Sequence, residues 1–273
     1  MADQQRVYAI RRPWTAVISG ALVGVLGGMI GLGGAEFRLP ILIAVFALFP
    51  HRAVRFNLLV SFVTLVFAVM TRLKLNSTPD LASYADVLAS MIAGGMSAAW
   101  IGAGALSRVP ADRLMQIIAG LLLVVSVMLF AEAAYTGDMP FALPHNTLVR
   151  SGVGLLAGLL VGAISSLLGV AGGEFIIPIL IFIFGADIKT AGTLSLLISL
   201  PVVAVGVAKH RLTGHYRSWD VLEHLVLPMS LGSILGAVIG GYLSAAAPIR
   251  LLKIVLAVIL AASGYKLTHK ARV

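Results

Sequence analysis

The chain has 273 residues, of which 59% are hydrophobic and 11% are charged, and its mean hydropathy is +1.02. In soluble domains about a quarter of the residues are charged, so this composition excludes an ordinary water-soluble globule. The formal net charge is +9, and the complete lack of cysteine excludes disulfides, thiol catalysis and thiolate metal sites.

Eight apolar stretches follow one another along the chain, and each is long enough to cross a hydrocarbon core about 30 Å thick as a helix. Such runs favour helices because lipid leaves the backbone to satisfy its own hydrogen bonds, whereas barrel strands alternate in character. The first run lacks a convincing signal-peptide cleavage site, so we expect a retained helix. The sequence predicts an all-α polytopic integral membrane protein. The stretches are 14–30, 53–71, 87–106, 114–134, 152–168, 188–208, 221–243 and 251–265.

Two copies of one unit make up the chain, related by a shift of 138 positions. The shift places residues 31–42 on 169–180, and seven of these twelve pairs are identical. Turn residues mark the join between the copies. We place an N-terminal tail at 1–13, the first membrane repeat at 14–135, a loop at 136–147, the second membrane repeat at 148–267 and a C-terminal tail at 268–273.

Each copy reads as a helix, a glycine-rich break, a short apolar segment and three full-length helices. If the short segment spans the bilayer, each half has five crossings, and if it pairs with the preceding helix as a re-entrant loop, three remain. Both counts are odd, which predicts inverted repeats of the kind found in many secondary transporters. We therefore expect broken helices, short half-helices at the Gly-Glu-Phe motifs and eight to ten membrane segments. The distribution of Lys and Arg predicts that both termini are cytoplasmic.

The glycine-rich breaks are the candidate substrate site. Free N–H groups at a helix start, together with the helix dipole, favour an anion, and matched breaks in two halves point to a transport site. The alternative is that the glycines only permit a turn or close helix packing. The recurrence of Glu and Pro at the same offsets favours the transport site. The candidates are Gly33, Gly34, Ala35, Glu36, Phe37 and Arg38, with Gly172, Gly173, Glu174 and Phe175 in the second copy.

Glu36 and Glu174 are candidates for proton coupling, because a carboxylate at bilayer depth is costly and its protonation would relieve repulsion with an anionic substrate. The alternative is a structural carboxylate held by free N–H groups at the helix start. The sequence leaves both readings open. Arg38 has no cationic counterpart, since Ile176 stands at its position in the second copy. It is interpreted as a substrate ligand, a snorkelling side chain or a partner of Glu36.

Polar residues recur on the helix that follows each short segment. Asn57 and Ser61 lie four residues apart on one helical face, and the shift places Ser195 and Ser199 on the corresponding face. These side chains either face a shared cavity with the substrate or hydrogen-bond to neighbouring helices. His210 and His215 are interpreted as surface histidines of a basic loop.

Two segments, 31–42 and 169–180, each a glycine-rich break followed by Glu-Phe-x-x-Pro, resemble the signature segments of the TauE/SafE sulfite exporter family. The resemblance implies a transporter of sulfur-containing anions such as sulfite, sulfonates or sulfoacetate in the bacterial inner membrane. The partners expected are a small anion and the lipid bilayer, with a homodimer as one candidate assembly. We expect no nucleic acid, no cofactor and no metal.

The leading hypothesis is alternating access with proton coupling. An uncoupled anion channel and an intramembrane enzyme are the alternatives. Common enzyme signatures and a Walker-type phosphate loop are absent from the sequence, so an enzyme is not the expected class.

Overall fold

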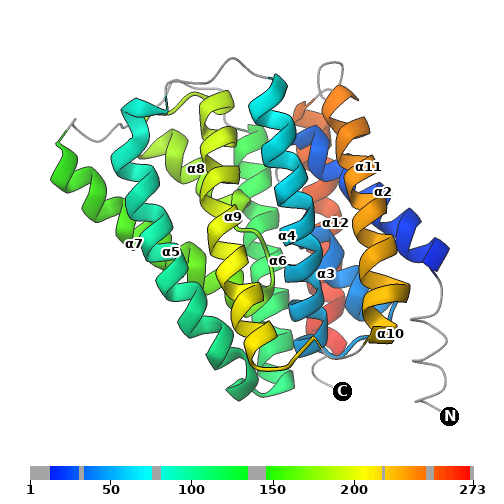
Figure 1. The fold of residues 1–273 in the computed structure, drawn as a ribbon. Helices are drawn as coiled ribbons and strands as arrows, with labels where there is room; N and C mark the ends of the chain where they lie inside the picture. The colour runs from blue at the N-terminus through cyan, green and yellow to red at the C-terminus, as the bar shows by residue number, and fades with distance from the viewer. Residues whose placement is uncertain are drawn as a thin grey trace, which may run out of the picture. The chain divides into compact units, whose positions relative to one another are not determined.

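The computed structural model describes residues 13–30, 34–75, 81–134, 146–216, 219–243 and 249–270, and every regular element in these ranges is a helix (Figure 1). The predicted all-α class is therefore confirmed. The α-helices are α2 (Pro13–Ile30), α3 (Ala35–Ala44), α4 (Pro50–Leu75), α5 (Ala85–Ala105), α6 (Ala111–Ala134), α7 (Thr147–Leu168), α8 (Gly173–Phe182), α9 (Ile188–Leu212), α10 (Trp219–Val221), α11 (Leu227–Leu243) and α12 (Ile249–Lys270). Short 3-10 helices η1 (Ala82–Tyr84) and η2 (Leu106–Arg108) and a π-helix η3 (Leu222–Val226) complete the series.

Six helical segments in the described ranges are long and apolar enough to cross a membrane. The helices α3 and α8 differ from these because each has only ten residues. Ten helical residues extend about 15 Å, which is half the thickness of the hydrocarbon core. Neither short helix can therefore span the core alone, as predicted for half-helices at the two motifs. The six segments are Pro50–Met70, Ala82–Arg108, Ala111–Ala131, Thr147–Leu168, Thr190–Leu212 and Trp219–Gly240.

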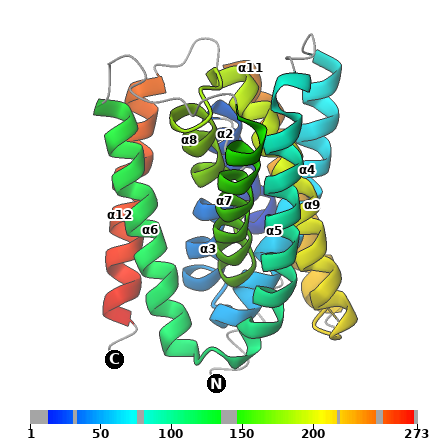
Figure 2. The same ribbon diagram turned by 90° about the vertical axis from the view of Figure 1, so that its left-hand side faces the viewer.

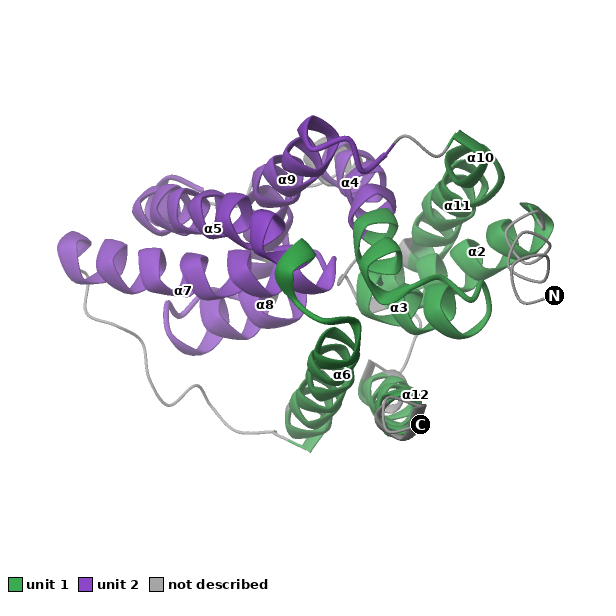
Figure 3. Ribbon diagram, turned by 90° about the horizontal axis from the view of Figure 1, so that it is seen from below, with its two compact units in different colours: residues 1–57, 107–137, 218–273 green, residues 58–106, 138–217 purple. Residues whose placement is uncertain are grey.

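The helices form two compact units, and each unit combines segments from both sequence halves (Figure 3). Unit 1 contains residues 1–57, 107–137 and 218–273, and therefore α2, α3, α6, α10, α11, α12 and the start of α4. Unit 2 contains residues 58–106 and 138–217, and therefore the rest of α4 with α5, α7, α8 and α9. The repeat boundaries and the inversion of the second copy stay predictions.

In unit 1, α2 lies along α11 in direct backbone contact (Figure 1). A Cβ atom added at Gly20 would lie 2.2 Å from the carbonyl oxygen of Met229, and one added at Gly24 would lie 2.3 Å from that of Ser233. Only glycine permits this approach, since real Cβ atoms do not come within 3.0 Å of such atoms. The helices α6 and α12 also lie side by side in this unit, where the Ser126 hydroxyl donates to the carbonyl of Ala257 at 2.8 Å (Figure 2).

The same contact occurs in unit 2, between α5 and α7. A Cβ atom at Gly158 would lie 2.3 Å from the carbonyl oxygen of Met91, and one at Gly162 would lie 2.2 Å from that of Gly95. Under the shift of 138 positions, Gly158 corresponds to Gly20 and Met91 to Met229. One interhelix contact is thus made twice, and each time it joins a helix of one half to a helix of the other.

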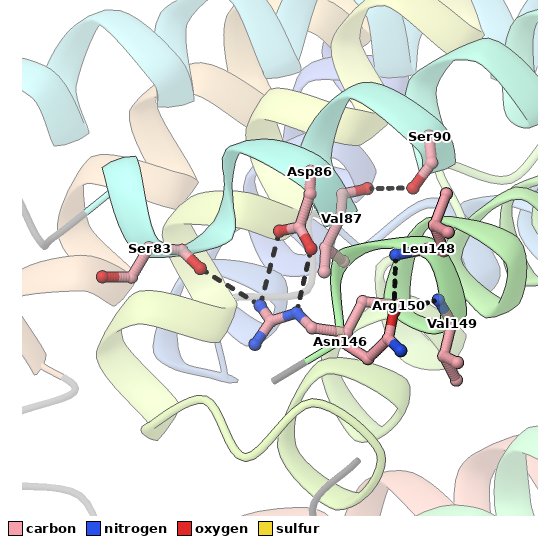
Figure 4. A network of polar contacts seen from close by, with 8 residues as sticks. All are labelled: Ser83, Asp86, Val87, Ser90, Asn146, Leu148, Val149 and Arg150. Atoms are coloured by element: carbon pink, nitrogen blue, oxygen red, sulfur yellow. Dashed lines mark hydrogen bonds and ion pairs between the residues drawn. The ribbon is translucent and has the colours of Figure 1, made fainter. Parts of the chain in front are cut away.

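An ion pair fixes the start of α7 to the start of α5 in unit 2 (Figure 4). The Nε atom of Arg150 donates to Asp86 at 3.0 Å, and its Nη2 atom donates to the carbonyl of Ser83 at 3.1 Å. The Asn146 side chain caps α7 by accepting from the N–H of Leu148 at 3.0 Å. The side chains of Arg150 and Asp86 are only 7% and 18% exposed, so this pair is largely withdrawn from water.

The glycine contact can be tested by replacing two different glycines of α7 with alanine, one inside the contact and one outside it as a control. Gly158→Ala forces a methyl group against the backbone of Met91 and is expected to cost about 1–3 kcal/mol, the usual effect of overpacking. Gly152→Ala has no atom within 4 Å of the new Cβ, and it is expected to be neutral or to stabilise the helix by about 0.5–1 kcal/mol. Thermal unfolding of the purified protein in detergent measures both, and equal midpoints would contradict the contact.

The ion pair is tested by Asp86→Asn, which leaves the guanidinium of Arg150 without its charged partner. Because the pair is largely buried, we expect a loss of about 2 kcal/mol in stability, the usual contribution of a hydrogen bond to a charged group. The control is Asp220→Asn, whose partner His224 lies 3.5 Å away in a pair that is 36% and 44% exposed. An exposed pair contributes about 0–1 kcal/mol, so the control should unfold near the wild-type temperature.

Candidate functional site

The break in the first copy is a left-handed turn placed directly before α3. Gly34 has φ 73°, and a Cβ atom there would lie 2.8 Å from both the Cγ1 atom and the carbonyl oxygen of Val23 on α2. Both the dihedral angle and the lack of space therefore require glycine at this position. Gly33, which the sequence also assigned to the site, lies outside the described residues.

The break in the second copy has the same construction. Gly172 has φ 81° and directly precedes α8, and a Cβ atom there would lie 2.6 Å from the Cγ1 atom of Val161 on α7. Val161 corresponds to Val23 under the shift, so a valine at the equivalent position packs against the glycine of each turn. Gly169 ends α7 with φ 67°, and its N–H donates to the carbonyl of Ser165 at 2.8 Å. The repeated motif thus produces a repeated helix break.

Glu36 and Glu174 occupy the first turns of α3 and α8. Their exposed fractions are 0% and 4%, and neither carboxylate accepts a hydrogen bond from any other residue in the described ranges. A purely structural carboxylate at a helix start would accept hydrogen bonds from nearby backbone N–H groups. Two buried carboxyl groups that accept no hydrogen bond from another described residue therefore stand at equivalent positions of the two units.

Asn57 connects α4 to the break in unit 1. Its Nδ2 atom donates to the carbonyl of Ala35 at 2.9 Å, and its side chain is fully buried. Ser61 lies one turn further along α4 and is also buried. The hydroxyl of Thr64, by contrast, donates to the carbonyls of Val60 and Ser61 within its own helix. The structure therefore brings Asn57 together with the first residues of the short helix.

The second copy has smaller polar groups at the matching positions. Ser195 and Ser199 lie on α9, and both are buried. The helix α9 packs against α8, which begins with Gly173, Glu174 and the buried Phe175. The predicted residues of the second motif thus lie in unit 2 on two helices that pack together, with the shorter Ser195 at the position of Asn57.

Arg38 does not reach the protein surface, because only 1% of it is exposed. Its Nη1 atom donates to the hydroxyl of Ser233 on α11 at 3.3 Å. Sequence reasoning missed Ser233, since it lies 195 residues away in the other half and its counterpart is Gly95. The sequence did contain one sign of this contact, because position 233 carries a hydroxyl group and the equivalent position 95 does not.

His210 is not in a surface loop, so that interpretation was wrong. The helix α9 continues to Leu212, and His210 lies in its last turn with no exposed surface. Its ring contacts those of His215 and Tyr216 edge to face, at centroid distances of 5.8 and 6.3 Å. The apolar stretch stops at residue 208, where basic residues begin, but the helix continues through those residues to Leu212.

Two proteins similar to this chain are named as probable membrane transporters. The chain is 26% identical to the "Probable membrane transporter protein YunE" of Bacillus subtilis (strain 168), over 89% of this chain and 94% of that protein. It is 29% identical to the "Probable membrane transporter protein y4hK" of Sinorhizobium fredii (strain NBRC 101917 / NGR234), over 57% of this chain and 61%, less than two thirds, of that protein. No solved structure matches.

The family comparison covers most of the chain. The family model described as "Sulfite exporter TauE/SafE" matches residues 16–267, which include both breaks and both short helices. The chain therefore belongs to the sulfite exporter TauE/SafE family.

Proposed function

We propose that the protein is a secondary transporter that moves a small sulfur-containing anion across the bacterial inner membrane by alternating access, coupled to protons. The anion would be sulfite, a sulfonate or a sulfoacetate-like compound. The observation that carries the proposal is the pair of buried carboxyl groups, Glu36 and Glu174, each in the first turn of a short helix behind a glycine break. Cytoplasmic termini and a homodimer are part of the proposal.

The breaks supply the anion-binding chemistry. At each of them the chain enters a helix through a glycine, so the first N–H groups of α3 and α8 have no partner earlier in the same helix. Such groups attract an anion, and the helix dipole adds to the attraction. The side chains proposed to complete the two substrate sites are those of Phe37, Arg38, Asn57, Ser61, Phe175, Ser195 and Ser199.

The carboxyl groups supply the coupling. An ionised carboxylate repels an incoming anion in a medium of low dielectric constant, where charges interact strongly. Protonation of Glu36 or Glu174 removes that repulsion, so uptake of a proton and uptake of an anion favour one another. One proton moving with one monovalent anion carries no net charge, and a pH gradient alone can then drive accumulation.

Purified protein in liposomes with labelled sulfite tests this coupling. A gradient of about one pH unit drives up to about tenfold accumulation when one proton accompanies each anion. We expect accumulation by the wild type and an accumulation ratio near one for Glu36→Gln and for Glu174→Gln, because glutamine cannot carry the proton. The matched control is Glu223→Gln in η3, an exposed position that should keep the wild-type ratio.

Each outcome has a clear meaning. If both glutamine variants at the buried positions accumulate sulfite as the wild type does, proton coupling through these groups is wrong. If the wild type conducts sulfite but never accumulates it in response to the gradient, the protein is an uncoupled channel. If neither sulfite nor a sulfonate crosses the membrane in any condition, the proposed substrate class is wrong.

A further inference from the structure

The end of α7 carries a buried serine that was not among the candidate site residues. Ser165 is only 1% exposed, and its hydroxyl has no hydrogen-bond partner in the described ranges. A serine hydroxyl inside a helix commonly donates to a carbonyl of the preceding turn, as the neighbouring Ser166 does to Ala163 at 3.1 Å. A buried hydroxyl that lacks a partner costs free energy, and a ligand oxygen can recover that cost.

Ser165 lies on the face of α7 that packs against the second break. Val161 is one turn earlier on the same face, and a Cβ atom added at Gly172 would lie 2.6 Å from its Cγ1 atom. Because a helical side chain leans over the turn before it, the hydroxyl of Ser165 leans toward Val161 and the glycine turn. The carbonyl of Ser165 accepts from the N–H groups of Gly169 and Val170 at 2.8 and 3.3 Å, which joins this serine to the break.

The start of α8 follows the same turn and offers donors of its own. The first four N–H groups of an α-helix have no partner within that helix. Those of Phe175 and Ile176 donate to the carbonyl of Gly172 at 3.1 and 3.0 Å, whereas no backbone carbonyl of the described ranges accepts from those of Gly173 and Glu174. The break thus combines a helix start, which favours an anion, with a buried hydroxyl that no described residue binds.

The first copy has different groups at the matching positions. The shift of 138 positions places Gly27 at the position of Ser165 and Arg38 at the position of Ile176. The second break therefore has an aliphatic side chain where the first has a cation, and a hydroxyl where the first has only a hydrogen atom. Because backbone N–H groups and hydroxyls are neutral donors, each of them adds to the binding of an oxyanion without adding a buried charge.

We propose that Ser165 is a further substrate ligand, whose hydroxyl donates a hydrogen bond to an oxygen of the anion that binds at the break of unit 2. The N–H groups at the start of α8 bind the same anion. This inference rests on the proposed function, because it takes the transported oxyanion to be the ligand. It adds a ligand to the second of the two substrate sites and leaves the first unchanged.

Uptake of labelled sulfite by the full-length protein in liposomes tests the proposal through the KM for sulfite. Ser165→Ala should raise this KM about threefold to tenfold, the effect of losing one neutral hydrogen bond. Ser165→Cys should raise it to a similar extent, because a thiol keeps the length of the side chain but is a weak donor. Ser166→Ala is the matched control, since this equally buried serine donates within its own helix, and it should keep the wild-type KM.

Thermal unfolding in detergent separates a substrate ligand from a structural residue. A hydroxyl that binds no other group of the protein does not stabilise the fold, so without sulfite Ser165→Ala should unfold at or above the wild-type midpoint. Sulfite should raise the midpoint of the wild type and of Ser166→Ala by the same amount. It should raise the midpoint of Ser165→Ala by less, because weaker binding gives less stabilisation at the same concentration.

The results separate this proposal from the general function. A wild-type KM in both Ser165→Ala and Ser165→Cys, or a lower midpoint of Ser165→Ala than of the wild type without sulfite, would overturn the assignment while leaving anion transport intact. If the wild type transports neither sulfite nor a sulfonate, the proposed function fails and this ligand with it. If Ser165→Ala does not fold, the KM of Ser165→Cys decides the outcome.

Discussion

A helix that is interrupted at membrane depth must have its exposed backbone groups satisfied by the protein, since lipid offers no hydrogen bonds. In the first copy Asn57 donates to the carbonyl of Ala35 and so joins α4 to the start of α3. The glycines before α3 and α8 allow the chain to turn in a left-handed conformation that other residues rarely adopt. The candidate site depends on this arrangement because each turn places a helix start and a buried carboxyl group at one point.

The two compact units explain how one sequence unit, used twice, builds two similar sites. In each unit a helix that precedes a break packs along a helix from the other half, α2 on α11 and α7 on α5. The turn of each break rests on a valine of the preceding helix, Val23 or Val161. Each half therefore supplies the motif of one unit and part of the support for the other, so neither site is formed by a single half.

The sequence was sufficient to predict the features that depend on local patterns. Apolar length predicted the helices, and the glycines, Glu36 and Glu174 and their shared offset predicted the two breaks and the short helices. It did not predict the partnership of Arg38 with Ser233, because contacts between distant helices leave no local pattern. The burial of His210 was missed for a related reason, since charged neighbours made a helix end resemble a loop. The ion pair of Arg150 with Asp86 was not predicted either, because it joins residues of two different helices.

The glycine contacts between α2 and α11 and between α5 and α7 have an evolutionary consequence. The atoms that face Gly20, Gly24, Gly158 and Gly162 at closest range are backbone carbonyl oxygens, which every amino acid carries in the same place. A bulkier residue at one of these glycines cannot be rescued by a smaller residue on the opposite helix, because no side chain there can be trimmed. No second mutation can therefore compensate for a larger residue at these four positions. We expect these positions to vary less among homologues than the buried positions around them.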